Sequence, residues 1–106
     1  MAELEAPIAA MIDATNAEDS AAFLAAFAPD AVLVDWGREY AGRERIADWN
    51  RTDNIGVHSR IAVRDASRIG DVTTVTIQVT GDGYNGGGAF VFRTADGLIS
   101  RMDITG

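Results

Sequence analysis

Asp35 is the residue of this sequence whose surroundings most suggest chemistry. It closes the apolar run AVLVD and directly precedes Trp36. On a strand it shares a face with Ala31 and Leu33, so its carboxylate could be partly removed from water. Removal from water raises the pKa of a carboxyl group and makes it a better general base near neutral pH. The alternative is that Asp35 accepts hydrogen bonds from the turn at Gly37, a common role of an aspartate at a strand end.

Arg101 and Asp103 form a second polar pair, two residues apart near the end of the chain. By strand alternation they lie on the same face as Ile99. If that face lines the interior, the two side chains could orient a polar ligand or position a water molecule. If it faces outward, they form a simple ion pair on the sheet surface, and alternation alone leaves both alternatives open.

The adjacent residues His58 and Ser59 do not form a nucleophile and base pair, because neighbours on a strand point to opposite faces. His58 shares its face with Arg60 and Arg64. This pattern favours a solvated or structural histidine, with proton transfer as the alternative.

No cofactor or metal is expected. The segment GDGYNG at residues 81–86 matches the dinucleotide-binding fingerprint by its letters, but that fingerprint must lead into a helix. Here the following letters, GGGAFVFR, predict a strand, so a glycine-rich hairpin is the better interpretation. The chain has no cysteine and one histidine, which disfavours a zinc site.

Composition restricts the function classes further. The 106 residues carry a net charge of −7, and an acidic surface disfavours nucleic-acid binding. No apolar stretch approaches the roughly 20 residues that span a membrane. The acidic amino terminus does not resemble a signal peptide, so we expect a single cytoplasmic domain at residues 1–106. Arginine without lysine, together with abundant alanine and glycine, suggests a GC-rich bacterial genome.

Hydrophobic periodicity predicts helices first and strands after them, which is an α+β fold. Apolar residues at helical spacing favour a first helix over 4–15, and a second helix follows, with Phe27 on its buried side and Pro29 ending it. A short strand covers 31–36, and a third helix after Gly42 carries Ile46 and Trp49 one turn apart. Alternating residues predict four further strands, at 57–64, 72–80, 89–94 and 98–104.

The stretch FLAAFAPDAVLVDWGREYAGRERIADW resembles the nuclear transport factor 2-like superfamily, and within it the SnoaL-like group. The matching pattern is a helix, F-x-x-D-A, a short strand, and a glycine turn leading into a third helix. This resemblance implies a cone of three N-terminal helices packed on a strongly curved antiparallel sheet, which encloses an apolar pocket. It also implies a homodimer formed through the outer face of the sheet, as in many members.

Among the ketosteroid isomerases of this superfamily, the resemblance puts Asp35 at the catalytic base. Their oxyanion-binding tyrosine corresponds to Met11, and their protonated aspartate falls near Gly88. Ketosteroid isomerisation is therefore disfavoured, because an enolate would lack its donors. The same comparison turns Arg101 and Asp103 inward and places three further residues on the pocket wall, Trp49, Phe90 and Phe92.

The limonene epoxide hydrolases of the superfamily offer a second analogy. They use an Asp–Arg–Asp set to activate water, and Asp35, Arg101 and Asp103 supply these residue types here. The chain lacks an obvious match to their tyrosine and asparagine pair.

We therefore expect a small-molecule enzyme, an isomerase, cyclase or hydrolase, acting on an apolar oxygenated substrate. Asp35 would be the general base, and Arg101 with Asp103 would bind the substrate oxygen. The apolar ligand would contact a wall formed by Met11, Trp36, Trp49, Phe90 and Phe92. The alternative is a non-catalytic ligand-binding or dimerisation domain of the same fold. A protein-transport adaptor is a third possibility, supported by the shared fold alone.

Overall fold

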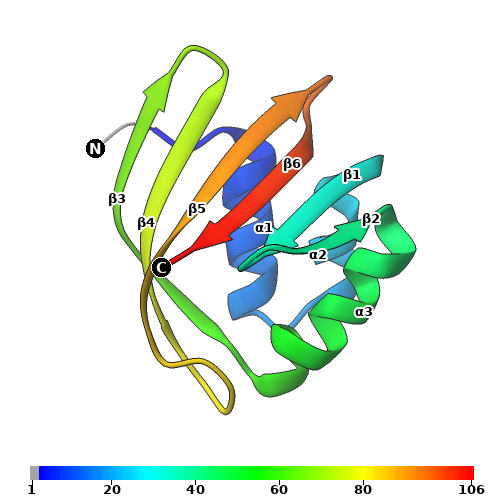
Figure 1. Cartoon of the computed structure of the whole chain (residues 1–106), viewed down its shortest axis with the longest axis vertical. Helices are drawn as coiled ribbons and strands as arrows, with labels where there is room; N and C mark the ends of the chain where they lie inside the picture. Colours follow the sequence, from blue (N-terminus) through cyan, green and yellow to red (C-terminus); the bar gives the residue numbers. More distant parts are fainter. Residues whose placement is uncertain (1–2) are drawn as a thin grey trace.

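The computed structural model describes residues 3–106 and consists of one six-stranded sheet with three α-helices packed against it (Figure 1). The strand order is β2-β1-β6-β5-β4-β3; β1 and β6 are parallel and all other neighbours are antiparallel. The elements in chain order are α1 (Ala6–Asn16), α2 (Ser20–Ala25), β1 (Phe27–Asp35), β2 (Arg38–Ala41), α3 (Arg43–Asp53), the 3₁₀ turn η1 (Ile55–Val57), β3 (Arg60–Ile69), β4 (Val72–Thr80), β5 (Gly86–Ala95) and β6 (Leu98–Thr105). The predicted α+β class is confirmed.

The helices differ from the expectation in two respects. Only α1 and α2 precede the first strand, whereas α3 follows β1 and β2. The second helix ends at Ala25, so Phe27 and Pro29 belong to β1 and not to a helix. Phe27 pairs with Ile99 of β6, a partner far along the chain that overrides the local helical pattern.

The core fills the space between the helices and the inner face of the sheet. The predicted apolar stripe of α1 is confirmed, since Ile8, Met11 and Ile12 are buried there. Phe23 is the centre of an aromatic cluster, with ring centroids 5.1 Å from Phe27 and 6.2 Å from Trp49. This packing fixes α3 against the edge of the sheet that β1 and β2 form.

The glycine-rich segment GDGYNG connects β4 to β5, and a strand follows it, as the sequence predicts. The side chain of Asn85 bonds the loop to itself, with its amide oxygen accepting from Gly81 N and its amide nitrogen donating to Gly81 O and Gly83 O. Among residues 3–106, no helix is long and apolar enough to cross a membrane.

Candidate functional site

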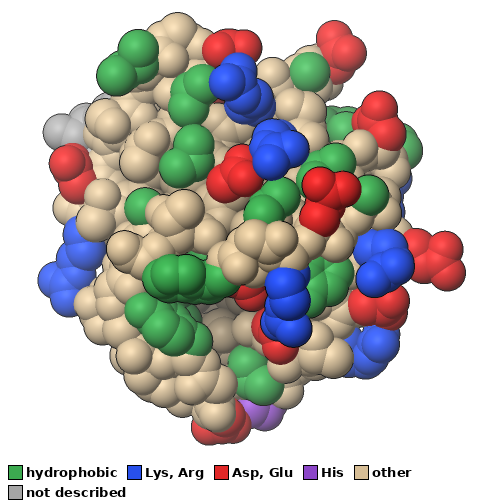
Figure 2. Space-filling model, in the orientation of Figure 1, with side chains coloured by type: hydrophobic (Ala, Val, Ile, Leu, Met, Phe, Trp, Pro, Cys, Tyr) green, Lys and Arg blue, Asp and Glu red, His purple; other side chains and the backbone are tan. Residues whose placement is uncertain are grey.

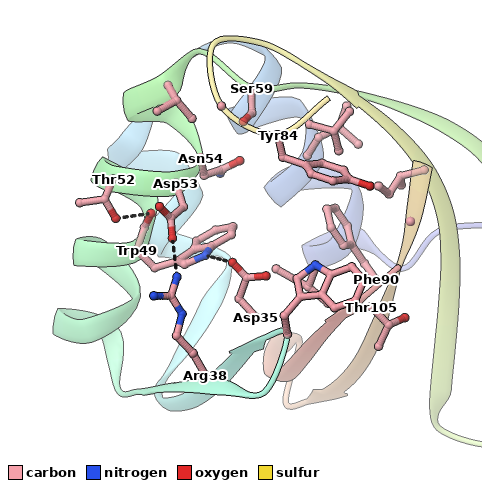
Figure 3. A pocket seen from close by; sticks show the side chains of 18 of the residues that line it. Asp35, Arg38, Trp49, Thr52, Asp53, Asn54, Ser59, Tyr84, Phe90 and Thr105 are labelled. Atoms are coloured by element: carbon pink, nitrogen blue, oxygen red, sulfur yellow. Dashed lines mark hydrogen bonds and ion pairs between the residues drawn. The ribbon is translucent and has the colours of Figure 1, made fainter. Parts of the chain in front are cut away.

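A cavity of about 280 Å³ lies between α3, η1 and the inner face of the sheet, and it opens to solvent (Figure 3). Figure 2 shows hydrophobic side chains beside acidic and basic ones around a hollow in the lower half of the same view. The lining is mainly apolar or aromatic with a few polar groups. It comprises Asp35, Trp36, Arg38, Trp49, Thr52, Asp53, Asn54, Val57, Ser59, Ile61, Ile77, Val79, Gly83, Tyr84, Gly87, Gly88, Phe90, Ile104 and Thr105.

Asp35 enters this cavity from the end of β1. Its neighbours on the inner face, Ala31 and Leu33, are buried, so the alternation predicted for this strand is confirmed. The turn after it is made by Trp36 and Gly37, with φ of 50° and 85°. Positive φ at both positions is the pattern of a two-residue type I′ hairpin, which closes through backbone geometry. The turn thus does not need the Asp35 side chain. The carboxylate of Asp35 points into the cavity (Figure 3).

Trp49 of α3 holds this carboxylate. Its indole nitrogen donates a hydrogen bond of 2.9 Å to Asp35 Oδ2. Among residues 3–106, no side chain or backbone group donates to the other oxygen, Oδ1. One carboxylate oxygen is thus fixed by an indole, while the second remains available to a bound molecule.

The predicted aromatic wall is present in part. Trp36, Trp49 and Phe90 line the cavity, and the first of these is two-thirds exposed at its mouth. Met11 and Phe92 are fully buried and lie outside the lining. Phe92 packs edge-on against Phe90 on the same face of β5, with ring centroids 6.0 Å apart, so it supports the wall from the core.

Arg101 and Asp103 lie outside the cavity lining, in contrast to the predicted inward orientation. The reason is a β-bulge in β6. Thr94 pairs with Ile99 and Arg93 pairs with Arg101, which leaves Ser100 as an extra residue. One extra residue reverses the alternation, so side chains after it change face.

On that outer face the two residues bond to each other. Arg101 Nε lies 2.8 Å from Asp103 Oδ2, and the hydrogen bond and charge of Asp103 raise the pKa of Arg101. Their partners on β1 are Val32 and Val34, which alternate with the buried residues of that strand. The geometry matches the second alternative for this pair, an ion pair on the sheet surface.

A further ion pair stands at the rim of the cavity. Arg38 Nη2 lies 3.6 Å from Asp53 Oδ2, and both residues belong to the lining. The Arg38 side chain is 70% exposed, so this contact is screened by water.

Most of the other lining residues escaped the sequence interpretation, among them Asn54, Ser59 and Tyr84. Asn54 and Ser59 are each only 4% exposed, and both side chains reach the cavity from the segment between α3 and β3 (Figure 3). Tyr84 comes from the β4–β5 loop, and its hydroxyl donates to Gly87 O over 2.6 Å. The available signal was the NRTDN run at the end of α3, where Asn50 and Asn54 are one helical turn apart.

His58 lies between two cavity-lining residues, yet it is not part of the lining. It adopts a left-handed conformation, and its Nδ1 lies 2.6 Å from Glu18 Oε1. The hydrogen bond and the charge of Glu18 raise the pKa of the His58 imidazole. Its contacts join the α1–α2 turn to the start of β3 and involve no cavity group.

No described part of the chain forms a metal site: within residues 3–106, no three histidine, cysteine or carboxylate side chains gather closely enough to hold an ion.

Comparison with known families assigns the chain. The model of the SnoaL-like domain matches residues 8–102. The chain belongs to the SnoaL-like family. A Cytophaga hutchinsonii protein described as NTF2-like, 14% identical with a TM-score of 0.80 over 98% of this chain and 92% of that one, shows the fold that the resemblance implied. Among curated proteins, no sequence matches the chain.

Several solved structures are similar to this SnoaL-like protein. A Sinorhizobium meliloti protein provisionally assigned as a polyketide cyclase is 27% identical, with a TM-score of 0.88 over 96% of this chain and 95% of that one. A Mycobacterium tuberculosis protein in complex with estradiol-17β-hemisuccinate is 18% identical, with a TM-score of 0.81 over 92% and 88%. A computationally designed 17-OHP binder is also 18% identical, with a TM-score of 0.84 over 94% and 87%. The last two likenesses show the fold alone.

Proposed function

We propose that this SnoaL-like protein binds an apolar, oxygenated small molecule in the cavity and acts on it with Asp35 as general base. The reaction class is an isomerisation, cyclisation or hydrolysis that begins with removal of a proton. One observation carries the proposal: the free Oδ1 of Asp35 faces an apolar cavity, while its Oδ2 is held by Trp49. A fixed carboxylate beside an apolar wall can accept a proton from a bound substrate.

The structural neighbours support the ligand class. One is provisionally assigned as a polyketide cyclase, and another holds a steroid derivative. A polyketide or steroid combines an apolar body with a few oxygen atoms, which suits a cavity with aromatic walls and few polar groups. Residue 88 is a glycine, so this chain offers no carboxylic acid at that position to stabilise an enolate. Ketosteroid isomerisation therefore remains disfavoured.

Proton removal can be tested without knowing the substrate. We would follow hydrogen–deuterium exchange at the α-carbon of cyclic ketones such as β-tetralone in D₂O by NMR. The protein should accelerate exchange, and Asp35→Asn should lower the acceleration about 100-fold, within the range typical of a lost general base. Asp71→Asn is the matched control, because it makes the same charge change on the exposed β3–β4 hairpin. Equal loss in both variants, or no acceleration by the parent protein, would overturn the proposal.

A non-catalytic ligand-binding domain is the second candidate. It is favoured by the position of Arg101 and Asp103 away from the cavity, which leaves Asp35 as the one predicted catalytic residue that lines it. In that case ligands bind in the cavity beside Asp35, but hydrogen–deuterium exchange of the ketone stays at its rate in buffer. We further propose a homodimer formed through the outer sheet face, where Val34 and Val91 flank Asp103.

A further inference from the structure

The inner wall of the cavity presents oxygen atoms that lack partners. Asn54 Nδ2 donates to Thr15 Oγ1 over 3.2 Å and to Asn50 Oδ1 over 3.0 Å. Asn50 Oδ1 also accepts from Ile55 N. An amide oxygen can only accept, so Asn54 must turn its NH₂ group toward Asn50 and its own carbonyl oxygen toward the cavity (Figure 3). Among residues 3–106, nothing donates to this oxygen.

Ser59 adds a second free oxygen beside the first. Its hydroxyl has no partner within the described chain, although the residue is 4% exposed. Within residues 3–106, every fully enclosed side-chain oxygen or nitrogen has a hydrogen-bond partner. The free oxygen atoms of Asn54 and Ser59 have none, so they must border open space. The cavity is the space that both residues line.

Three side-chain hydrogen-bond donors of the lining are already in use. The Trp49 indole donates to Asp35, the Tyr84 hydroxyl donates to Gly87 O, and the Thr52 hydroxyl donates to Asp48 O. Within the described residues, the Trp36 indole and the Ser59 hydroxyl remain free to donate, whereas Asn54 Oδ1 can only accept. A ligand that covers Asn54 Oδ1 without a hydrogen bond destabilises the complex, so the ligand must bring at least one donor to this oxygen.

The charges of the lining favour a cation over a neutral donor. The lining contains two carboxylates, Asp35 and Asp53, against one guanidinium, Arg38, which is mostly in water. Aromatic faces from both tryptophans, Tyr84 and Phe90 add sites that attract a cation. The whole chain carries −7, which raises the local concentration of positively charged ligands.

We infer that the ligand carries a protonated amine, which binds Asn54 Oδ1 and Ser59 Oγ while its apolar body lies along the aromatic wall. This names the substrate class of the proposed site, and it rests on the proposed function for the choice of cavity. Asp35 remains the carboxylate that acts on the other end of the molecule, since it faces Asn54 and Ser59 across the cavity (Figure 3).

Tryptophan fluorescence gives a direct test, because both tryptophans of the chain line the cavity. Three probes of similar shape would be titrated at pH 7: benzylamine, benzyl alcohol and benzyltrimethylammonium. Benzylamine should bind at least tenfold more tightly than benzyl alcohol, which lacks the charge. It should also bind more tightly than benzyltrimethylammonium, which carries the charge but no N–H donor.

Ser59→Ala separates the proposed head-group site from a general preference for cations. It should lower the affinity for benzylamine about threefold to tenfold, the effect of one hydrogen bond, and leave benzyltrimethylammonium unaffected. Ser67→Ala on β3, an exposed residue outside the cavity lining, is the matched control. If Ser59→Ala fails to fold by circular dichroism, the three-probe comparison on the parent protein decides alone.

The outcomes separate this inference from the proposed function. Benzyl alcohol binding as tightly as benzylamine would overturn the inference, while ketone exchange through Asp35 would still support the proposed function. The expected amine preference together with unchanged ketone exchange in Asp35→Asn would support the inference and defeat the general-base role. No change in tryptophan emission with any amine, ketone or steroid would overturn both.

Discussion

The indole nitrogen of Trp49 donates a hydrogen bond of 2.9 Å to the carboxylate of Asp35, fourteen residues away in the sequence. The bond joins α3 to the end of β1, the two elements that enclose one side of the cavity. It also orients the carboxylate, since it fixes one oxygen and leaves the other free. This single contact thus serves both the fold and the proposed chemistry.

Trp49→Phe should destabilise the protein by about 2–4 kcal/mol, because it removes a donor to a charged group and leaves a void where the indole packed. Asp35→Asn should cost less, since the asparagine oxygen can still accept from Trp49. Asp35→Ala removes the acceptor, so urea unfolding of Trp49→Phe, Asp35→Ala and the double variant measures the coupling between the two residues. Trp36→Phe is the control, as that side chain is two-thirds exposed and should change stability by less than about 1 kcal/mol.

Additive effects of Trp49→Phe and Asp35→Ala would contradict this account. The two residues would then contribute independently, and the hydrogen bond would contribute nothing measurable to stability.

The inner-face position of Asp35 could be predicted from the sequence because it depends on strand alternation alone. Ala31, Leu33 and Asp35 are spaced two residues apart, and the pairing of β1 with β2 is regular from Val32 to Asp35. The stripe of α1 was predictable for the same reason, since helical spacing is a local property. The hydrogen bond from Trp49 was not, because it depends on the crossing of two elements.

Arg101 and Asp103 illustrate where alternation fails. Their face depends on the extra residue at Ser100, and nothing in the letters around it marks a bulge. Asn54 and Ser59 were missed for a related reason. The direction of the Asn54 side chain depends on Asn50 and on Thr15, a residue 39 positions earlier, and the backbone nitrogen of Ser59 in turn donates to Asn54 O. Such a network becomes visible only when the helices are packed together.

Gly88 and Gly87 provide a matched pair for testing space beside the cavity. A Cβ on Gly88 would lie 2.8 Å from the backbone oxygen of Thr105, whereas a Cβ on Gly87 would have no atom closer than 3.6 Å. Gly88→Ala should therefore cost about 1–3 kcal/mol in unfolding free energy and weaken ligand binding. Gly87→Ala should stay within about 1 kcal/mol of the parent.

Urea unfolding and tryptophan titration on both glycine variants check this prediction. Equal stability of Gly88→Ala and Gly87→Ala would show that β6 moves aside and that the close approach to Thr105 is unimportant.

The pair of His58 and Glu18 should make stability depend on pH. The hydrogen bond that the imidazole donates to Glu18 raises the pKa of folded His58 above the value of about 6.5 expected when unfolded. The stabilising effect is therefore complete below pH 6.5 and is lost as the pH rises through the folded pKa. His58→Asn, which tolerates the left-handed backbone, should melt below the parent at pH 6, and the difference should shrink toward pH 9.

Thermal unfolding between pH 5 and pH 9 measures this effect. In a Glu18→Gln background, His58→Asn should no longer change the pH dependence. A difference that stays constant with pH would show that the backbone conformation, and not the ion pair, is responsible.

The proposed homodimer predicts a specific effect of charge on the outer sheet face. Val91 of β5 lies there opposite Asp103, and Val34 of β1 lies on the other side of the same residue. Val91→Arg would bury an unpaired charge in an interface between two such faces and should convert the dimer to a monomer.

Light scattering coupled to size-exclusion chromatography reports the mass directly. Ala10→Arg, on the exposed side of α1, is the control and should leave the mass at two chains. A parent protein that elutes as a monomer, or a Val91→Arg variant that remains dimeric, would place any interface elsewhere on the molecule.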